Sequence, residues 1–270
     1  MTSLLATDLD GTLLDSFGKI SQQNVDAIVR AKADGLEVVF ATGRPPRWMD
    51  EIPSLHDAVS YSICANGAVL FDLTKRAIVS AHYIDPDVGR AAIEQIRIID
   101  PNASFAVELA REHDDFVLDD GYQPRWESPR PVPRLRSEEL FDSGRVVKLL
   151  ARPSRQVQLT ADSFVAHAEE LISHIVDVTH SNSYDVLLEM SPLGVNKGSA
   201  LAQFALERGL QPANVAAVGD MPNDIPMVTW AGRGGAVENA HDDLKAIADD
   251  LLPSNDDHAI ATFIHRILGQ

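Results

Sequence analysis

The chain has 270 residues, of which 45% are hydrophobic, and it carries a formal net charge of −17 at pH 7. This acidity argues against nucleic acid as a partner, because phosphate backbones require a basic protein surface. The single cysteine, Cys64, excludes an internal disulfide framework and a multi-cysteine zinc site, and it fits the reducing cytoplasm.

The N-terminal residues predict a buried strand that ends in two acids. The apolar run 4–6 leads into Asp8-Leu9-Asp10-Gly11-Thr12, with no signal-peptide pattern. Asp8 and Asp10 suit a nucleophile beside a general acid/base, a hard-metal site, or both. A turn capped by acids is the alternative. No apolar stretch approaches the roughly 18 residues of a membrane span, so we expect a soluble, cytoplasmic protein without a membrane partner.

Strands and helices then alternate as far as residue 82. Ser21 is a candidate N-cap for a helix to residue 33, and a second apolar run, 36–41, ends in Thr42-Gly43-Arg44. Asn66-Gly67-Ala68 follows another strand-like run and is a turn signal. This alternation predicts a parallel sheet with helices on both of its faces.

The alternation of strands and helices stops near Asp85-Pro86, which is typical of an N-cap followed by proline at the first helical position. Two helices and several strands without regular alternation then predict an α+β subdomain. Alternation resumes near residue 191. We therefore expect a split first domain, residues 1–83 and 191–270, with residues 84–190 inserted as a second domain.

The segment 125–155 departs from the acidic character of the chain. Its net charge is about +4, and that of the remainder is about −21. The segment is either a solvated basic loop, or some of its arginines face the active site and attract an anionic substrate.

The last motifs lie in the returning half of the first domain. Asn196-Lys197-Gly198 opens a helix-like stretch, and the apolar run 215–218 ends in Gly219-Asp220-Met221-Pro222-Asn223-Asp224. In an open α/β sheet, ligands bind beyond the carboxyl ends of the strands. We expect Asp8, Thr42 and Asp220 to meet at that edge, with Lys197 near a helix start.

This order of Asp, Thr, Lys and a final acid cluster resembles the haloacid dehalogenase (HAD) superfamily, specifically its Cof-type phosphatases. The resemblance runs from Leu4 to about Ile267. It implies the α/β class: a Rossmann-like parallel-sheet core with an inserted α+β cap that determines substrate selectivity. It also implies Mg²⁺-dependent hydrolysis of small phosphorylated metabolites, with sugar phosphates as the first guess, through an aspartyl-phosphate intermediate.

The resemblance assigns roles to individual residues. Asp8 is the expected nucleophile, Asp10 the general acid/base, and Thr42 and Lys197 the groups that bind the phosphoryl oxygens. The expected Mg²⁺ ligands are the carboxylates of Asp8 and Asp220 and the backbone carbonyl of Asp10.

Further residues are expected to support the site. Asp224 would orient Lys197 or a water on the metal, and Asn223 would bond a phosphate oxygen or such a water. Gly11 and Gly43 would let the backbone approach phosphate. The tentative substrate-binding residues are Arg44, Asn66, Gly67, Arg134 and Arg136, although Arg44 could instead pair with a surface acid and Asn66 could be a turn residue only.

Two other functions remain open at this point. A sugar phosphomutase of the same superfamily would need a second phosphate site in the cap, for which the arginines of 125–155 are candidates. A non-catalytic metabolite-binding module is the second alternative, against which the complete set of motifs argues. The sequence does not indicate whether the chain forms oligomers.

Overall fold

A computed structural model describes residues 2–52, 55, 57–111, 115–125, 131–182 and 185–269. The chain divides into two compact units: Met1–Ser80 with Asn196–Gln270, and Ala81–Val195. The sequence predicts the crossings at 83/84 and 190/191, whereas the units divide at 80/81 and 195/196. The return crossing is later because the strand Leu188–Pro192 continues its pairing past Met190, with Ser191 opposite Asp177 and Pro192 opposite Val176.

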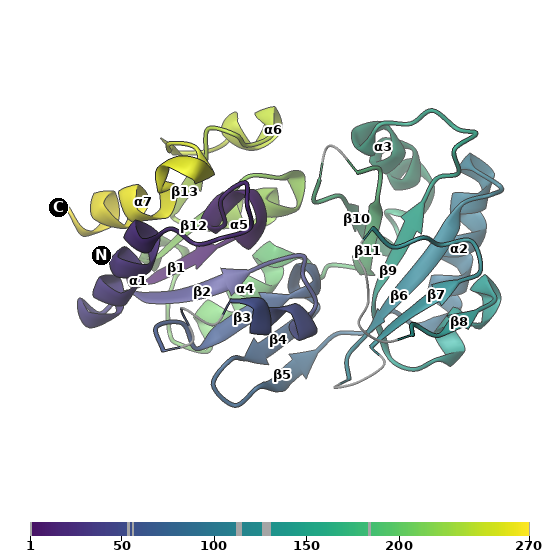
Figure 1. The fold of residues 1–270 in the computed structure, drawn as a ribbon, viewed down its shortest axis with the longest axis horizontal. Coiled ribbons are helices and arrows are strands. Elements are labelled where there is room, and N and C mark those ends of the chain that lie inside the picture. The colour runs from purple at the N-terminus through teal and green to yellow at the C-terminus, as the bar shows by residue number, and fades with distance from the viewer. Residues whose placement is uncertain are drawn as a thin grey trace. The chain divides into compact units, whose positions relative to one another are not determined.

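The first unit is built on an eight-stranded sheet in the order β14-β13-β12-β1-β2-β3-β4-β5 (Figure 1). The strands from β14 to β3 pair in parallel, and β4 is antiparallel to β3. β1 and β12 are buried along their whole length, which explains their continuous apolar runs. The strands are β1 (Leu4–Thr7), β2 (Glu37–Ala41), β3 (Tyr61–Cys64), β4 (Val69–Asp72), β5 (Ala77–Ala81), β12 (Val215–Gly219), β13 (Arg233–Ala236) and β14 (Asp250–Leu251).

Helices of the first unit pack in two pairs, α1 with α7 and α4 with α5, and both pairs contact the sheet. Ser21 caps α1 as expected, because its hydroxyl oxygen accepts from the Asn24 N–H at 3.3 Å. The chain passes from the short helix Asp242–Lys245 into β14, which begins at Asp250. The helices are α1 (Gln22–Ala33), α4 (Lys197–Leu206), α5 (Ile225–Trp230), α6 (Asp242–Lys245) and α7 (Ala259–Leu268).

The second unit holds a six-stranded sheet in the order β10-β11-β9-β6-β7-β8, with only the last pair parallel. Two helices, α2 (Pro86–Ile99) and α3 (Ala161–Ile172), pack on each other and bury a core that includes Phe105, Leu149 and Met190. The strands are β6 (Ser104–Leu109), β7 (Phe116–Asp119), β8 (Arg134–Leu135), β9 (Val146–Arg152), β10 (Val176–Thr179) and β11 (Leu188–Pro192).

The predicted α/β class, a parallel-sheet core interrupted by an α+β unit, is therefore confirmed. The parallel pairing has one direct consequence for function. The carboxyl ends of β2, β1 and β12 lie side by side at one edge of the first sheet, because Thr7 at the end of β1 is level with Phe40 of β2 and Val218 of β12.

The packing of the second unit requires a residue without a side chain at Gly89 in α2. A β-carbon at Gly89 would overlap the ring of Phe141, which is 4% exposed. Replacing a helical glycine by alanine ordinarily stabilises by about 0.5–1 kcal/mol. Here we expect Gly89→Ala to lower the free energy of unfolding by about 1–3 kcal/mol, because the ring must move within a packed core.

Urea unfolding measures this change, and Phe141→Leu in the Gly89→Ala background provides the control. Leucine lacks the outer ring atoms, so the double variant should lose less stability than the sum of the two single variants. A Gly89→Ala protein as stable as the wild type would show that the ring moves freely.

Candidate active site

The predicted residues follow the three strand ends that meet at one edge of the sheet. Asp8 follows β1, Thr42 follows β2 and Asp220 follows β12. All three are at least 93% buried. The Asp8 N–H donates to the carbonyl of Val218 at 3.0 Å, which joins the first of these loops to the strand that precedes Asp220.

Lys197 links two acids of this edge. It is the first residue of α4, and its ammonium donates to Asp8 Oδ1 at 2.7 Å and to Asp224 Oδ1 at 2.6 Å. Asn196 caps the helix, since its side chain accepts from the Ser199 N–H at 2.9 Å. The Lys197 side chain is 1% exposed. An ammonium buried this completely is stable only because both carboxylates are within reach.

Burial changes the acidity of these groups. It raises the pKa of Asp8 to about 7, against a lowering by Lys197 and with further raising by Asp224 and Asp10. Burial also raises the pKa of Asp220 well above its usual range, with Asp8 and Asp224 adding to the effect. Burial alone would lower the pKa of Lys197, but Asp224 and Asp8 outweigh it and raise that pKa. The cluster therefore holds more negative charge than its one ammonium can balance.

The turn after β1 is shaped around Asp220. The Thr12 hydroxyl donates to Asp220 Oδ1 at 3.2 Å. Gly11 has a φ of +76°, and a β-carbon there would overlap Asp220 Oδ2. Gly11 lies against this carboxylate, and its close approach to a phosphate stays a prediction.

A hard divalent cation fits the donors at this edge. The carboxylates of Asp8, Asp220 and Asp224 each offer an oxygen within 4.8 Å of the others. Asp224 is already engaged, because its Oδ1 accepts from Lys197 and its Oδ2 accepts from the N–H groups of Asp220 and Met221, both at 3.0 Å. Asp8 and Asp220 are then the carboxylates that would hold the cation, and oxygen donors of this kind suit Mg²⁺.

Asn223 adds a second indication. It is 5% exposed, and among the described residues no donor lies within hydrogen-bond distance of its Oδ1. A buried amide oxygen without a donor costs free energy unless a water or ligand satisfies it.

The Asp10 carboxylate is not part of the group formed by Asp8, Asp220 and Asp224. Its side chain is 57% exposed, and Arg44 grips it with two hydrogen bonds, from Nε to Oδ2 at 2.7 Å and from Nη2 to Oδ1 at 2.6 Å. A planar guanidinium matched to both oxygens of a carboxylate is the strongest geometry for such a pair. Arg44 therefore pairs with an exposed acid, the alternative that the sequence left open beside a substrate contact.

The loop after β2 is tied to its neighbours through backbone groups. The Thr42 N–H donates to the Ile63 carbonyl at 2.8 Å, and the Thr42 hydroxyl oxygen accepts from the Arg44 N–H at 3.0 Å, across Gly43. Asn66 lies against this loop, because its N–H donates to the Thr42 carbonyl at 3.1 Å. Gly67, with a φ of +103°, packs so closely on Asn196 that a β-carbon would overlap the Asn196 carbonyl.

Two residues that contact this site were not predicted from the sequence. Thr12 belongs to the Asp8–Thr12 motif, so its hydroxyl could have been considered. Asn239 donates to the Gly11 carbonyl at 2.8 Å, and its Oδ1 accepts from the Asn255 N–H at 3.0 Å. No spacing signals that contact, because it depends on two loops meeting 228 residues apart in the chain.

The arginines expected to bind substrate have partners inside the second unit. Arg134 Nη1 donates to the backbone carbonyls of Asp119 at 2.7 Å, Tyr122 at 3.0 Å and Asp120 at 3.3 Å. Arg136 forms an ion pair with Glu139.

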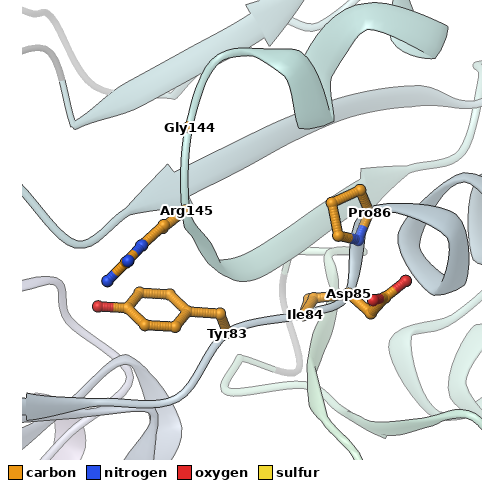
Figure 2. A pocket seen from close by; sticks show the side chains of 6 residues that line it. All are labelled: Tyr83, Ile84, Asp85, Pro86, Gly144 and Arg145. Carbon is orange, nitrogen blue, oxygen red and sulfur yellow. The ribbon is translucent and has the colours of Figure 1, made fainter.

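A pocket of about 530 Å³ opens where the second unit begins. The Arg145 guanidinium lies beside the Tyr83 ring, 5.2 Å from its centre (Figure 2). The pocket is lined by Tyr83, Ile84, Asp85, Pro86, Gly144 and Arg145. It includes none of the predicted site residues.

The sequence matches the haloacid dehalogenase-like hydrolase family over residues 5–264. The chain belongs to this family. A 5-amino-6-(5-phospho-D-ribitylamino)uracil phosphatase of Bacillus subtilis, YwtE, is 29% identical to this hydrolase over 98% of each sequence. A pyridoxal phosphate phosphatase of Escherichia coli, YbhA, is 26% identical over 99% of each.

A solved structure has the same fold. It is a phosphatase of the HAD superfamily from Bacteroides thetaiotaomicron, with a TM-score of 0.79 at 24% identity, covering 100% of this chain and 96% of the other. The predicted family is confirmed, and the chain is an enzyme of the phosphoric monoester hydrolase class. Within the described part of the chain, no helix is long and apolar enough to cross a bilayer.

The raised pKa of Asp8 predicts that cation binding depends on pH. A carboxyl whose pKa is about 7 in the folded protein and near 4 when unfolded makes the metal-free fold less stable as pH rises between those values. A cation must displace that proton below pH 7. At pH 5.5 we expect Mg²⁺ to bind about 30-fold more weakly than at pH 8, where Asp8 is largely ionised.

Thermal unfolding with and without MgCl₂ at the two pH values measures the effect, with KCl at equal ionic strength as the control. The rise in Tm with Mg²⁺ should be clearly larger at pH 8. Equal rises at both pH values would mean that Asp8 does not exchange its proton for the cation.

Proposed function

We propose that this hydrolase is a Mg²⁺-dependent phosphatase of small phosphorylated metabolites, acting through an aspartyl-phosphate on Asp8. The observation that carries the proposal is the buried Lys197 ammonium, 2.7 Å from Asp8 Oδ1. Asp8 shares its carboxylate cluster with Asp220, and both follow adjacent parallel strands. A carboxylate beside a fixed cation suits covalent phosphoryl transfer, because this reaction depends chiefly on the positioning of the reacting groups and on the stabilisation of charge.

The Asp8 and Asp220 carboxylates would hold the cation, with the Asp10 backbone carbonyl as the third ligand expected from the family. When bound, the cation would neutralise charge on the phosphoryl oxygens. In the first step, an oxygen of Asp8 attacks phosphorus and the bond to the ester oxygen breaks. Asp10 gives that oxygen a proton, so the leaving group departs as an alcohol.

In the second step, water attacks the phosphorus of the aspartyl-phosphate. Asp10 accepts a proton from the water, the bond to the Asp8 oxygen breaks, and inorganic phosphate leaves. In both steps the Lys197 ammonium balances negative charge on the phosphoryl oxygens, the Thr42 hydroxyl donates a hydrogen bond to one of them, and Gly43 allows the backbone to come close. Asp224 holds Lys197 in place at 2.6 Å.

The substrate class rests on the relatives. Two of them are named for a phosphorylated ribityl compound and for pyridoxal phosphate, which supports a small phosphate ester as the substrate. Sugar phosphates are our first choice. We assign selectivity to the inserted unit, residues 84–190 by the sequence boundaries. We place the enzyme in the cytoplasm, in keeping with the buried thiol of Cys64.

No observation favours a phosphomutase. That activity needs a second phosphate site, and the described arginines of segment 125–155 are largely engaged. Arg134 binds three carbonyls, Arg136 pairs with Glu139, and Arg152 and Arg125 pair with Asp185.

Asp8→Asn should abolish turnover without unfolding the protein. Asparagine has the same shape but is not a nucleophile, and Lys197 keeps its bond to Asp224. We expect phosphate release to fall by at least about a thousandfold. The measurement is phosphate release from a panel of sugar phosphates, pyridoxal phosphate and other small esters with Mg²⁺, with circular dichroism as the check on folding.

Activity present in the wild type and lost in Asp8→Asn supports the phosphatase, and the highest kcat/KM indicates the substrate class. Substantial release by folded Asp8→Asn would refute the nucleophile assignment.

Arg44→Lys distinguishes the two roles open to Arg44. Lysine keeps the charge but cannot form the two parallel hydrogen bonds that Arg44 makes to the Asp10 carboxylate. If Arg44 acts by holding Asp10, we expect kcat to fall about 10- to 100-fold with little change in KM, because a misplaced proton donor affects the reaction rather than binding.

Steady-state kinetics on the best substrate give both constants. Arg76→Lys is the matched control, since Arg76 pairs with Asp50 on the surface of the same unit. A raised KM with unchanged kcat would instead make Arg44 a substrate contact.

A further inference from the structure

Three successive residues in the loop after β3 have left-handed backbone conformations. Their φ angles are +50° at Ala65, +56° at Asn66 and +103° at Gly67. Glycine adopts such angles freely and asparagine tolerates them, whereas alanine at such an angle costs about 1–2 kcal/mol. A strained conformation persists only where its surroundings hold it, and it is common at functional sites.

The surroundings that hold this loop are two other loops of the site. The Ala65 N–H donates to the Arg44 carbonyl at 2.9 Å, and the Asn66 N–H donates to the Thr42 carbonyl at 3.1 Å. On the other side, Gly67 packs against the carbonyl of Asn196, the cap of the helix that begins with Lys197. The position of Asn66 is thus determined by Thr42, a proposed phosphoryl-binding residue, and through Gly67 by Asn196, which precedes Lys197.

The side chain of Asn66 reaches a third loop. Its Oδ1 accepts from Asn223 Nδ2 at 3.1 Å, and the two side chains belong to residues that are 2% and 5% exposed. An amide has a donor end and an acceptor end, so binding Nδ2 to Asn66 fixes where Oδ1 must point. That oxygen is the buried atom without a donor among the described residues.

We propose that Asn66 is a positioning residue, which orients the amide of Asn223 so that Oδ1 accepts a hydrogen bond from the hydration water of the cation held by Asp8 and Asp220. The proposal rests on the proposed phosphatase function. Asn223 lies in the short turn Pro222–Asp224. In the sequence it stands between Asp220 and Asp224, whose carboxylates belong to the acidic cluster. Mg²⁺ keeps several of its waters in proteins, and these supply the donors that Oδ1 lacks.

The test compares two substitutions of Asn66 in the whole protein. Asn66→Gly suits the left-handed backbone and removes only the side chain. Asn66→Asp also tolerates that backbone and keeps an oxygen that accepts from Asn223 Nδ2. Mg²⁺ affinity, measured by isothermal titration at pH 8, should fall about 10-fold or more in Asn66→Gly, as for other groups that orient metal ligands. It should not fall in Asn66→Asp, which keeps the accepting oxygen and adds a negative charge that favours a cation.

Asn223→Ala completes the comparison. Because Asn66 acts through Asn223, the double variant Asn66→Gly/Asn223→Ala should bind Mg²⁺ no more weakly than Asn223→Ala alone. Asn24→Ala is the control for lost stability: Asn24 is equally buried and its Oδ1 accepts from the Ala261 N–H at 3.0 Å. It should lower Tm without changing Mg²⁺ affinity.

Wild-type Mg²⁺ affinity in Asn66→Gly, or effects of the two single variants that multiply, would overturn the proposal. Both outcomes are read from metal binding. They are therefore independent of turnover, and an absence of phosphate release in the wild type would instead count against the proposed function.

Discussion

One buried ammonium shared by two carboxylates is the interaction on which the rest of the site depends. Lys197 holds Asp8 and Asp224, and Asp220 lies within the same cluster. Three carboxylates against one ammonium leave a formal charge of −2 in a region almost without solvent. A low-dielectric interior tolerates such an excess only through protonation or through a bound cation. The raised pKa of Asp8 and the fit to a divalent ion are thus two expressions of one constraint.

The loops at this edge of the sheet support one another because they approach very closely. At Gly11 and Gly67 both the left-handed backbone and the neighbouring loop exclude a side chain. Gly219 differs, since its backbone is ordinary but a β-carbon would overlap Asp224. Glycine is therefore required here by close contact with neighbouring atoms as much as by conformation, and the site has little room to relax when one loop changes.

Sequence reasoning located the residues that follow apolar strands, and it could not find the pairs that depend on two loops meeting. Asp8, Thr42 and Asp220 each come directly after a buried run, so their convergence follows from a parallel sheet. The pairing of Arg44 with Asp10, and of Asn66 with Asn223, leaves no trace in spacing. Arg134 is similar, because backbone carbonyls that accept from an arginine have no sequence signature.

The split of the first unit affects the order in which the protein can fold. During synthesis the second unit has its full sequence once residue 195 has been made, and its strands pair only among themselves. β1, at the centre of the other sheet, has to wait for β12, more than 200 residues later, before its second edge is covered. Contacts so distant in sequence close slowly. The inserted unit can therefore be complete on the ribosome while β1, the strand that precedes Asp8, still has one open edge.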